Sequence, residues 1–287
     1  MSRRYGVDGC RAGWFYFWIN GRVFGHGVAE ELSAVVSQGN ADVILVDMPI
    51  GLPDDDGNRD CDTVARRLLG RRASSVFPAP CRAALAASTY EEACAVNEQH
   101  TGRRLSRQCW NIVPKIREVD RLLLAGGRAR GRLRESHPEV CFTALNGGRP
   151  MVAAKRTPDG YQERLAVLRA KWPSAPKAAE AALAAYRRGD VGRDDILDAM
   201  VLAVTASLPA ARRETIPARP RKDDKGLPMS MVLAKMNGMN GMNGMNGMNG
   251  VNGMNGMNGM NGMNGRGASA MAKIKAKVKI YKKPIKN

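Results

Sequence analysis

The first 27 residues constrain the fold most, because three short apolar segments follow one another there with only tight turns between them. The segments cover residues 4–10, 14–19 and 22–27. Asn20-Gly21 separates the last two, and Asn-Gly is a preferred hairpin loop because both residues tolerate positive φ. The sequence therefore predicts an antiparallel three-strand meander. Asp8 lies at the end of its first strand, directly before Gly9.

A different kind of strand is expected at residues 42–47, where four consecutive apolar residues lie between two aspartates. Such a run is typical of a strand buried on both faces, as in the parallel part of an α/β sheet. Asp47 ends the run, and ligands of open α/β sheets bind at the carboxyl ends of strands. An aspartate before a glycine, such as Asp8, is also ordinary turn chemistry. Its role therefore depends on whether other carboxylates reach the same point.

Helical spacing accounts for most of the chain from there to residue 208. Helices are expected over residues 29–38, 60–69, 90–100, 106–124 (interrupted by Pro114), 161–172, 175–188 and 193–208. Residues 133–140 are expected to be extended, with Pro138 at the edge or end of a strand. The pattern predicts an α/β fold, a mixed sheet of meander and parallel strands flanked by helices.

The last of these helices carries two further carboxylates near its beginning. Asp195 and Asp198 are three residues apart, so they share a face. Beyond this turn the helix is apolar all round, which indicates burial on every side. The two acids should therefore face protein or a cleft. Favourable interaction with the helix dipole is the alternative, and it suits Asp194 better than Asp198.

Four aspartates are thus candidates for a single site: Asp8, Asp47, Asp195 and Asp198. Carboxylates about 4 Å apart repel by a few kcal/mol at an effective dielectric constant near 20, unless they share a proton or a cation. Oxygen ligands at a strand edge suit Mg²⁺ or Mn²⁺ rather than zinc. A pair of such ions can activate water and stabilise the leaving oxygen of a phosphodiester. We expect at least three of the four within reach of one cation.

Composition divides the chain into parts. Of 287 residues, 45 are Lys or Arg and 27 are Asp or Glu, which gives a net charge of +18. We expect one domain over residues 1–211, then a charged linker over 212–235, a Met-Asn-Gly repeat over 236–265 and a lysine-rich tail over 266–287. Excess positive charge suits a polyanionic partner such as nucleic acid, and it also simply favours solubility.

Cysteine spacing and hydropathy bear on the compartment. Six cysteines lie far apart, without a C-x-x-C motif, which indicates reduced, buried thiols and a cytoplasmic location. No apolar run approaches the ~20 residues that span a bilayer, so no membrane association is expected.

The order of these features resembles the ribonuclease H-like fold, and the chain resembles more closely the family known as domain of unknown function 429, described as predicted nucleases. The resemblance covers roughly residues 4–208. Its motifs are Gly6-Val-Asp8-Gly-Cys10 with Gly13-Trp14; Asp47-Met-Pro49-Ile-Gly51-Leu-Pro53; Arg59-x-Cys61-Asp62; Ser75-Val-Phe77 with Pro80 and Arg82; Lys115-Ile116 with Glu118; Glu135-x-His137-Pro138-Glu139; Lys155-x-Thr157 with Gly160; and Asp194-Asp195 with Asp198-Ala199. Ala12 departs from the family's usual glycine.

The resemblance implies a role for each matching position. Asp8 would be the central metal ligand and Asp47 the second, Asp195 and Asp198 would complete the site, and Glu135 or Glu139 would join as ligand or base. Phosphate contacts are implied for four basic residues, with surface ion pairs as the alternative: Arg59, Arg82, Lys115 and Lys155. His137 would contact a phosphate or water, or else pack or cap as a histidine before proline does.

The leading hypothesis is therefore a divalent-metal-dependent nuclease acting on DNA or RNA. Sugar kinases and actin-like ATPases use a similar strand-end aspartate, but they need two such domains and this chain offers one. The alternative from another class is a basic nucleic-acid- or protein-binding module whose carboxylates are vestigial.

Overall fold

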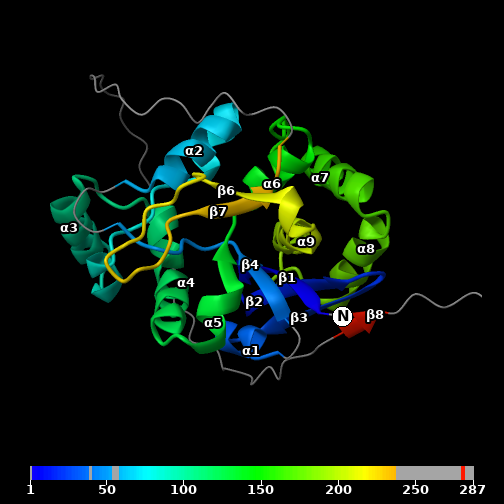
Figure 1. Cartoon of the computed structure of the whole chain (residues 1–287), viewed down its shortest axis with the longest axis horizontal. Helices are drawn as coiled ribbons and strands as arrows, with labels where there is room; N and C mark the ends of the chain where they lie inside the picture. The colour runs from blue at the N-terminus through cyan, green and yellow to red at the C-terminus, as the bar shows by residue number, and fades with distance from the viewer. Residues whose placement is uncertain (1, 39–40, 54–57, 237–278, 282–287) are drawn as a thin grey trace, which may run out of the picture.

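The structure, a computed structural model, describes residues 2–38, 41–53, 58–236 and 279–281. A mixed sheet has the strand order β5-β4-β1-β2-β3-β8 (Figure 1). Its strands are β1 (Arg3–Cys10), β2 (Gly13–Asn20), β3 (Val23–Ala29), β4 (Ala41–Val46), β5 (Leu133–Glu135) and β8 (Lys279–Tyr281). The expected meander is confirmed, since β1, β2 and β3 pair antiparallel. Strands β4 and β5 continue the sheet in parallel beside β1.

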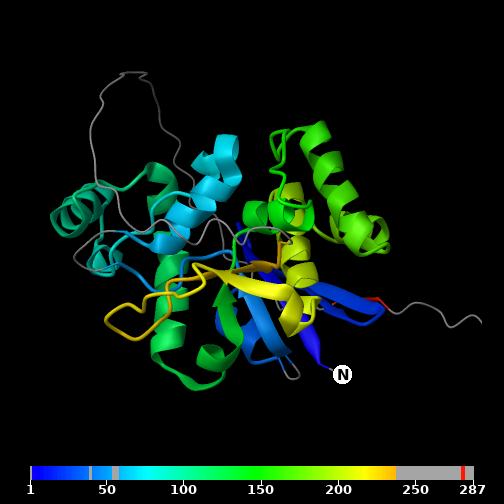
Figure 2. The same cartoon turned by 45° about the horizontal axis from the view of Figure 1, so that its top comes forward.

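Helices cover both faces of this sheet (Figure 2). The helices are α1 (Leu32–Val36), α2 (Asp60–Leu69), α3 (Tyr90–Thr101), α4 (Arg107–Leu124), α5 (Gly127–Arg132), α6 (Pro138–Leu145), α7 (Pro158–Lys171), α8 (Ala175–Ala185) and α9 (Arg193–Ser207). Three short 3₁₀ turns lie at Gly70–Ser75, Ala83–Ala86 and Ala210–Arg212. The predicted class, a mixed α/β sheet flanked by helices, is confirmed.

Strand β2 shows how the sequence divides the core. Its side chains alternate between the two faces of the sheet, as the period of a strand requires. Phe15 and Phe17 belong to the hydrophobic cluster that contains α6, α8 and α9. Trp14, Tyr16 and Trp18 belong to the opposite cluster, with α1 and α4. Because both faces are covered, this strand is apolar at every position from Trp14 to Ile19 and buried throughout.

Two local expectations differ from the structure. The extended segment ends at Glu135, and Pro138 begins α6 instead of lying at a strand edge. Proline suits the first turn of a helix, because the N–H that it lacks would have no partner there. Helix α4 continues through Pro114 without interruption.

The expected linker over residues 212–235 is folded onto the domain. Strands β6 (Arg213–Ile216) and β7 (Met231–Ala234) form an antiparallel pair, and Leu233 is fully buried in the same cluster as α6 and α9. Asp223 holds the connecting segment, since it accepts hydrogen bonds from the N–H groups of Leu52 and Leu227. The proline- and charge-rich residues of this segment obscured the apolar stretch that forms β7.

Most of the C-terminal region falls outside the described residues. This holds for the Met-Asn-Gly repeat apart from Met236, and for the lysine-rich tail apart from β8. Within the described residues no helix is both long enough and apolar enough to cross a membrane. All six cysteines are buried and unbridged, as expected.

Candidate active site

The register of the sheet places Asp8 beside Asp47. Val7 of β1 is level with Val46 of β4, and the N–H of Asp47 donates a hydrogen bond to the carbonyl oxygen of Val7 at 3.0 Å. Each aspartate follows its valine by one residue. Because Val7 and Val46 face the cluster of α1 and α4, alternation directs both aspartates toward the face that α9 covers.

Helix α9 brings the third carboxylate to the same place. A Cβ atom on Gly6 would lie 2.1 Å from the carbonyl oxygen of Ala199, so only glycine lets α9 pack this closely on β1. Asp198 lies in this contact with 2% of its surface exposed, and Asp8 with 7%. Asp8, Asp47 and Asp198 line one cavity of about 420 Å³.

The charges in this cavity oppose one another. Burial raises the pKa of Asp8 well above its ordinary value, and the charges of Asp47, Asp198 and Asp195 raise it further. Burial also raises the pKa of Asp47. The same cause raises the pKa of Asp198 to about 6, although Lys155 opposes the rise. The negative charge of the group is thus only partly compensated.

The two glutamates that the sequence left as alternatives both line this cavity, but they are held by different partners. Glu139, on α6, lines the cavity, and its charge acts on both Asp47 and Asp198. Its Oε1 pairs with Arg164 and Arg72, whereas its buried Oε2 has no hydrogen-bond partner among the described residues. Glu135, on β5, is level with Val46 of β4 and also lines the cavity, but it is held by Arg59, which lines the cavity as well. It therefore belongs to a different set of contacts.

The other expected residues are distributed as follows. His137 precedes α6 and lines the cavity; its Nε2 lies 3.1 Å from the carbonyl oxygen of Ser75, and its buried Nδ1 has no partner among the described residues. Lys155 also lines the cavity, and its Nζ lies 2.8 Å from Asp198. Asp195 lies outside the cavity lining, where its Oδ2 accepts a hydrogen bond from the N–H of Gly192 at the beginning of α9.

Two expected phosphate contacts are occupied elsewhere. Arg82 pairs with Asp120, Asp223 and Asp224, which ties α4 to the segment before β7. Lys115 donates to the carbonyl oxygen of Gly13 at 2.6 Å and lies over the ring of Trp14. Neither residue lines the aspartate cavity.

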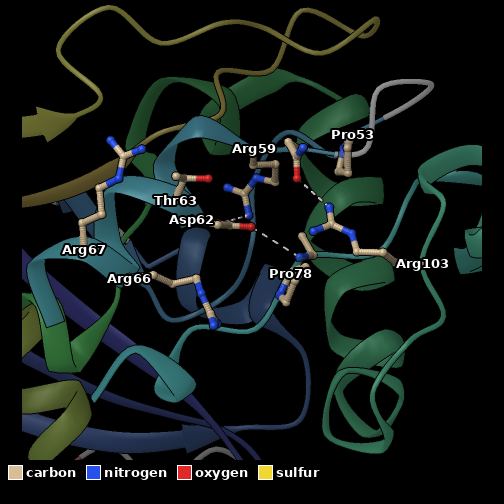
Figure 3. Close-up of a pocket in the computed structure, with 10 residues that line it drawn as sticks. Pro53, Arg59, Asp62, Thr63, Arg66, Arg67, Pro78 and Arg103 are labelled. Atoms are coloured by element: carbon tan, nitrogen blue, oxygen red, sulfur yellow. Dashed lines mark hydrogen bonds and ion pairs between the residues drawn. The ribbon is translucent and has the colours of Figure 1, made fainter. Parts of the chain in front are cut away.

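Beside the aspartates lies a second group of buried acids, and an arginine holds it together. Arg59 is 3% exposed, pairs with Asp62 at 3.3 Å and with Glu135, and donates to the carbonyl oxygen of Ile50 at 3.2 Å. Burial lowers the pKa of Arg59, but the charges of Asp62 and Glu135 raise it overall, so the guanidinium stays charged. Figure 3 shows Arg59 beside Asp62 at the wall of a hollow of about 460 Å³.

The second group also contains three residues whose possible metal-ligand atoms lie close together. Among the described residues, Cys61, Asp62 and Glu135 form a set whose ligand atoms all lie within 4.8 Å of one another, close enough to bind a metal ion. Arg59 already pairs with both of its carboxylates, although burial still raises the pKa of Glu135 to about 8, and burial strongly raises the pKa of Cys61, which keeps the thiol protonated. No three of the four expected aspartates approach one another this closely within the described part of the chain. That expectation is therefore not met in this structure.

Comparison with family models adds to this geometry. The model described as "Protein of unknown function (DUF429)" matches residues 6–222. The chain belongs to this family. The DUF429 match contains every residue of the cavity named above and ends between β6 and β7. Comparisons with curated proteins and with solved structures each found no match.

Sequence analysis missed the basic residues that surround the acids. Arg164 is 1% exposed and holds Glu139, and Arg72 contacts the same carboxylate. Arg156 lines the cavity next to Lys155. Arg164 is a buried residue of α7, and no local sequence signal distinguishes it from the exposed arginines of the chain.

Proposed function

We propose that this DUF429 protein is a divalent-metal-dependent nuclease of the ribonuclease H-like type, with Asp8, Asp47, Asp198 and Glu139 as its catalytic carboxylates. The observation that carries the proposal is the partly compensated cluster of carboxylates in one cavity at the end of β1 and β4, of which Asp47 is half-buried and the others are buried. A buried set of like charges is costly unless a cation joins it. The combination of meander, parallel β4 and acidic α9 supports the ribonuclease H-like assignment.

The donor set suits Mg²⁺ or Mn²⁺, because it consists of carboxylate oxygens, and Glu139 has a buried oxygen without a partner. Bound there, the metal would supply an activated water and stabilise the leaving oxygen of a phosphodiester. Two basic residues would orient the ligand carboxylates: Arg164 holds Glu139, and Lys155 holds Asp198. Binding requires these carboxylates to move closer together, because among the described residues no three of them have ligand atoms within 4.8 Å of one another.

The test is cleavage of a panel of single-stranded, duplex and branched DNA and RNA with and without Mg²⁺ or Mn²⁺. We expect metal-dependent cleavage by the wild type, none by Asp8→Asn, and wild-type rates for Asp60→Asn, which changes an exposed carboxylate on α2. Cleavage that persists in Asp8→Asn would refute the assignment of the site.

A second function is a nucleic-acid-binding module with a vestigial site. The Lys155–Asp198 ion pair favours it, because an ammonium group stands where a metal would compete. If the wild type and Asp8→Asn bind nucleic acid equally and neither cleaves it with any metal, this alternative replaces the nuclease.

A further inference from the structure

Another hollow, distinct from the one beside Arg59, adjoins the aspartate cavity at the beginnings of α7 and α9. It has a volume of about 240 Å³, and Lys155 and Arg156 line both it and the cavity. Four basic side chains line it, with one acidic side chain: Lys155, Arg156, Arg188, Arg193 and Asp194. We call the hollow lined by these residues the basic pocket. A group bound there would therefore lie next to a group bound at the aspartates.

The basic side chains of this pocket differ in how they are held. Lys155 and Arg156 both approach Asp194, at 3.7 Å and 3.4 Å. Arg188 and Arg193 are exposed, and within the described residues neither lies at ion-pair distance from a carboxylate. The pocket thus keeps positive charge that the described part of the chain does not neutralise. The N-termini of α7 and α9 add partial positive charge at the same place.

The pocket also contains an aromatic face. Tyr161 lines it, and the guanidinium of Arg193 lies 5.9 Å from the centre of the Tyr161 ring. Arginine and tyrosine side by side offer a charged contact for a phosphate and a flat surface for a base or sugar. The chemistry of the pocket therefore matches one nucleotide unit.

We propose that the basic pocket binds the phosphate next to the one held at the aspartates, so that the substrate is a polynucleotide strand and not a mononucleotide. This inference rests on the proposed function, since the aspartate cavity must hold the neighbouring phosphodiester. A strand repeats its negative charge at every nucleotide, so two adjoining sites of this kind are occupied together. A single nucleotide fills only one of them.

The test is binding, measured by fluorescence anisotropy with labelled 20-nucleotide single-stranded DNA and RNA of one sequence, on the Asp8→Asn background so that the probe stays intact. The double variant Arg188→Ala/Arg193→Ala should weaken binding about tenfold and reduce the slope of log K against log salt by about 1 to 2. The matched control is Arg169→Ala/Lys177→Ala, which removes two exposed charges from α7 and α8 outside the pocket. It should change the affinity less than twofold.

Equal losses in the two double variants would mean that overall charge alone attracts the strand, and the proposal would be overturned. It would also be overturned if a mononucleotide competed with the 20-mer as well as an unlabelled 20-mer does. The proposed function is tested separately, by metal-dependent hydrolysis of bis(p-nitrophenyl) phosphate. Hydrolysis of this small diester that is lost in Asp8→Asn but kept in Arg169→Ala/Lys177→Ala supports the function whatever the binding result.

Discussion

Two groups of buried acids lie side by side in this protein, and they are compensated differently. Asp62 and Glu135 surround one guanidinium, and backbone N–H groups of Ala79 and Ile50 point at the same carboxylates. Asp8 and Asp47 have no ion-pair partner among the described residues, and Asp198 has only Lys155, whose side chain is 37% exposed. The carboxylates of the first group are therefore held by ion pairs and hydrogen bonds, as is typical of charges that stabilise a fold.

The difference indicates where function resides. Removing one member of a compensated buried pair leaves the other charge buried without a partner, which destabilises the fold. Removing one member of an uncompensated group relieves repulsion, so the presence of such a group points to chemistry rather than to stability. Replacing a carboxylate by its amide is the same change in both groups. The comparison predicts that it reduces activity in the uncompensated group and stability in the compensated one.

The largest effect is expected for Asp47→Asn. If Asp47 holds the metal, its loss should reduce nucleic-acid cleavage at least about a thousandfold, equivalent to about 4 kcal/mol of barrier, while the fold stays intact. Glu135→Gln is the matched change in the arginine-held group and should leave the cleavage rate of the folded fraction within about threefold. Steady-state rates measure cleavage by each variant, and circular dichroism measures whether each variant is folded. Equal loss of activity in both variants would remove the distinction between the groups.

Stability should show the reverse order. Arg59→Met leaves Asp62 and Glu135 buried without their cation, and we expect the free energy of unfolding to fall by about 3 to 5 kcal/mol. Arg67→Met changes an exposed arginine on α2, the helix that Arg59 precedes, and should cost less than about 0.5 kcal/mol. Urea unfolding measures both. A loss below 1 kcal/mol for Arg59→Met would mean that the ion pairs do not organise this region.

Much of the fold could be predicted because it follows from local patterns. The Asn20-Gly21 turn, the apolar run before Asp47 and the apolar α9 each specify their element within a few residues. The exceptions are instructive. Pro138 suits both a strand end and a first helical turn, and helices that pack against α6 (α7 and α9) are distant in sequence.

The site was predictable in part, for the same reason. Asp8 and Asp47 follow from strand ends, but the choice between Glu135 and Glu139 depends on register and on the buried Arg164, neither of which has a local signal. Arg59 and Arg82 were expected at a phosphate because arginine suits phosphate. Their acidic partners Glu135 and Asp223 come from positions far along the chain, which only the folded structure brings to them.

The pH dependence of stability gives a smaller test. Because the pKa of Asp198 rises from 3.8 to about 6 on folding, its contribution to stability is fully present below pH 3.8 and is lost as the pH rises to about 6. Without metal, the wild type should lose about 2 to 3 kcal/mol relative to Asp198→Asn over this interval. Urea unfolding at several pH values with a chelator measures the difference. A difference that is constant from pH 4 to 7 would contradict the raised pKa.

The smallest effect decides which group of acids binds a metal. Ligand that binds only the folded state stabilises it by about 1.4 kcal/mol at ten times its dissociation constant. We expect Mg²⁺ to raise the thermal midpoint of the wild type and to have no effect on Asp8→Asn, because the aspartate cavity keeps uncompensated charge. Asp62→Asn alters the group with the closer ligand atoms, and it should retain the full response to Mg²⁺, since Arg59 already occupies those carboxylates. The opposite pattern, a response lost in Asp62→Asn and kept in Asp8→Asn, would make the arginine-held group the metal site and remove the basis for hydrolysis at the aspartates.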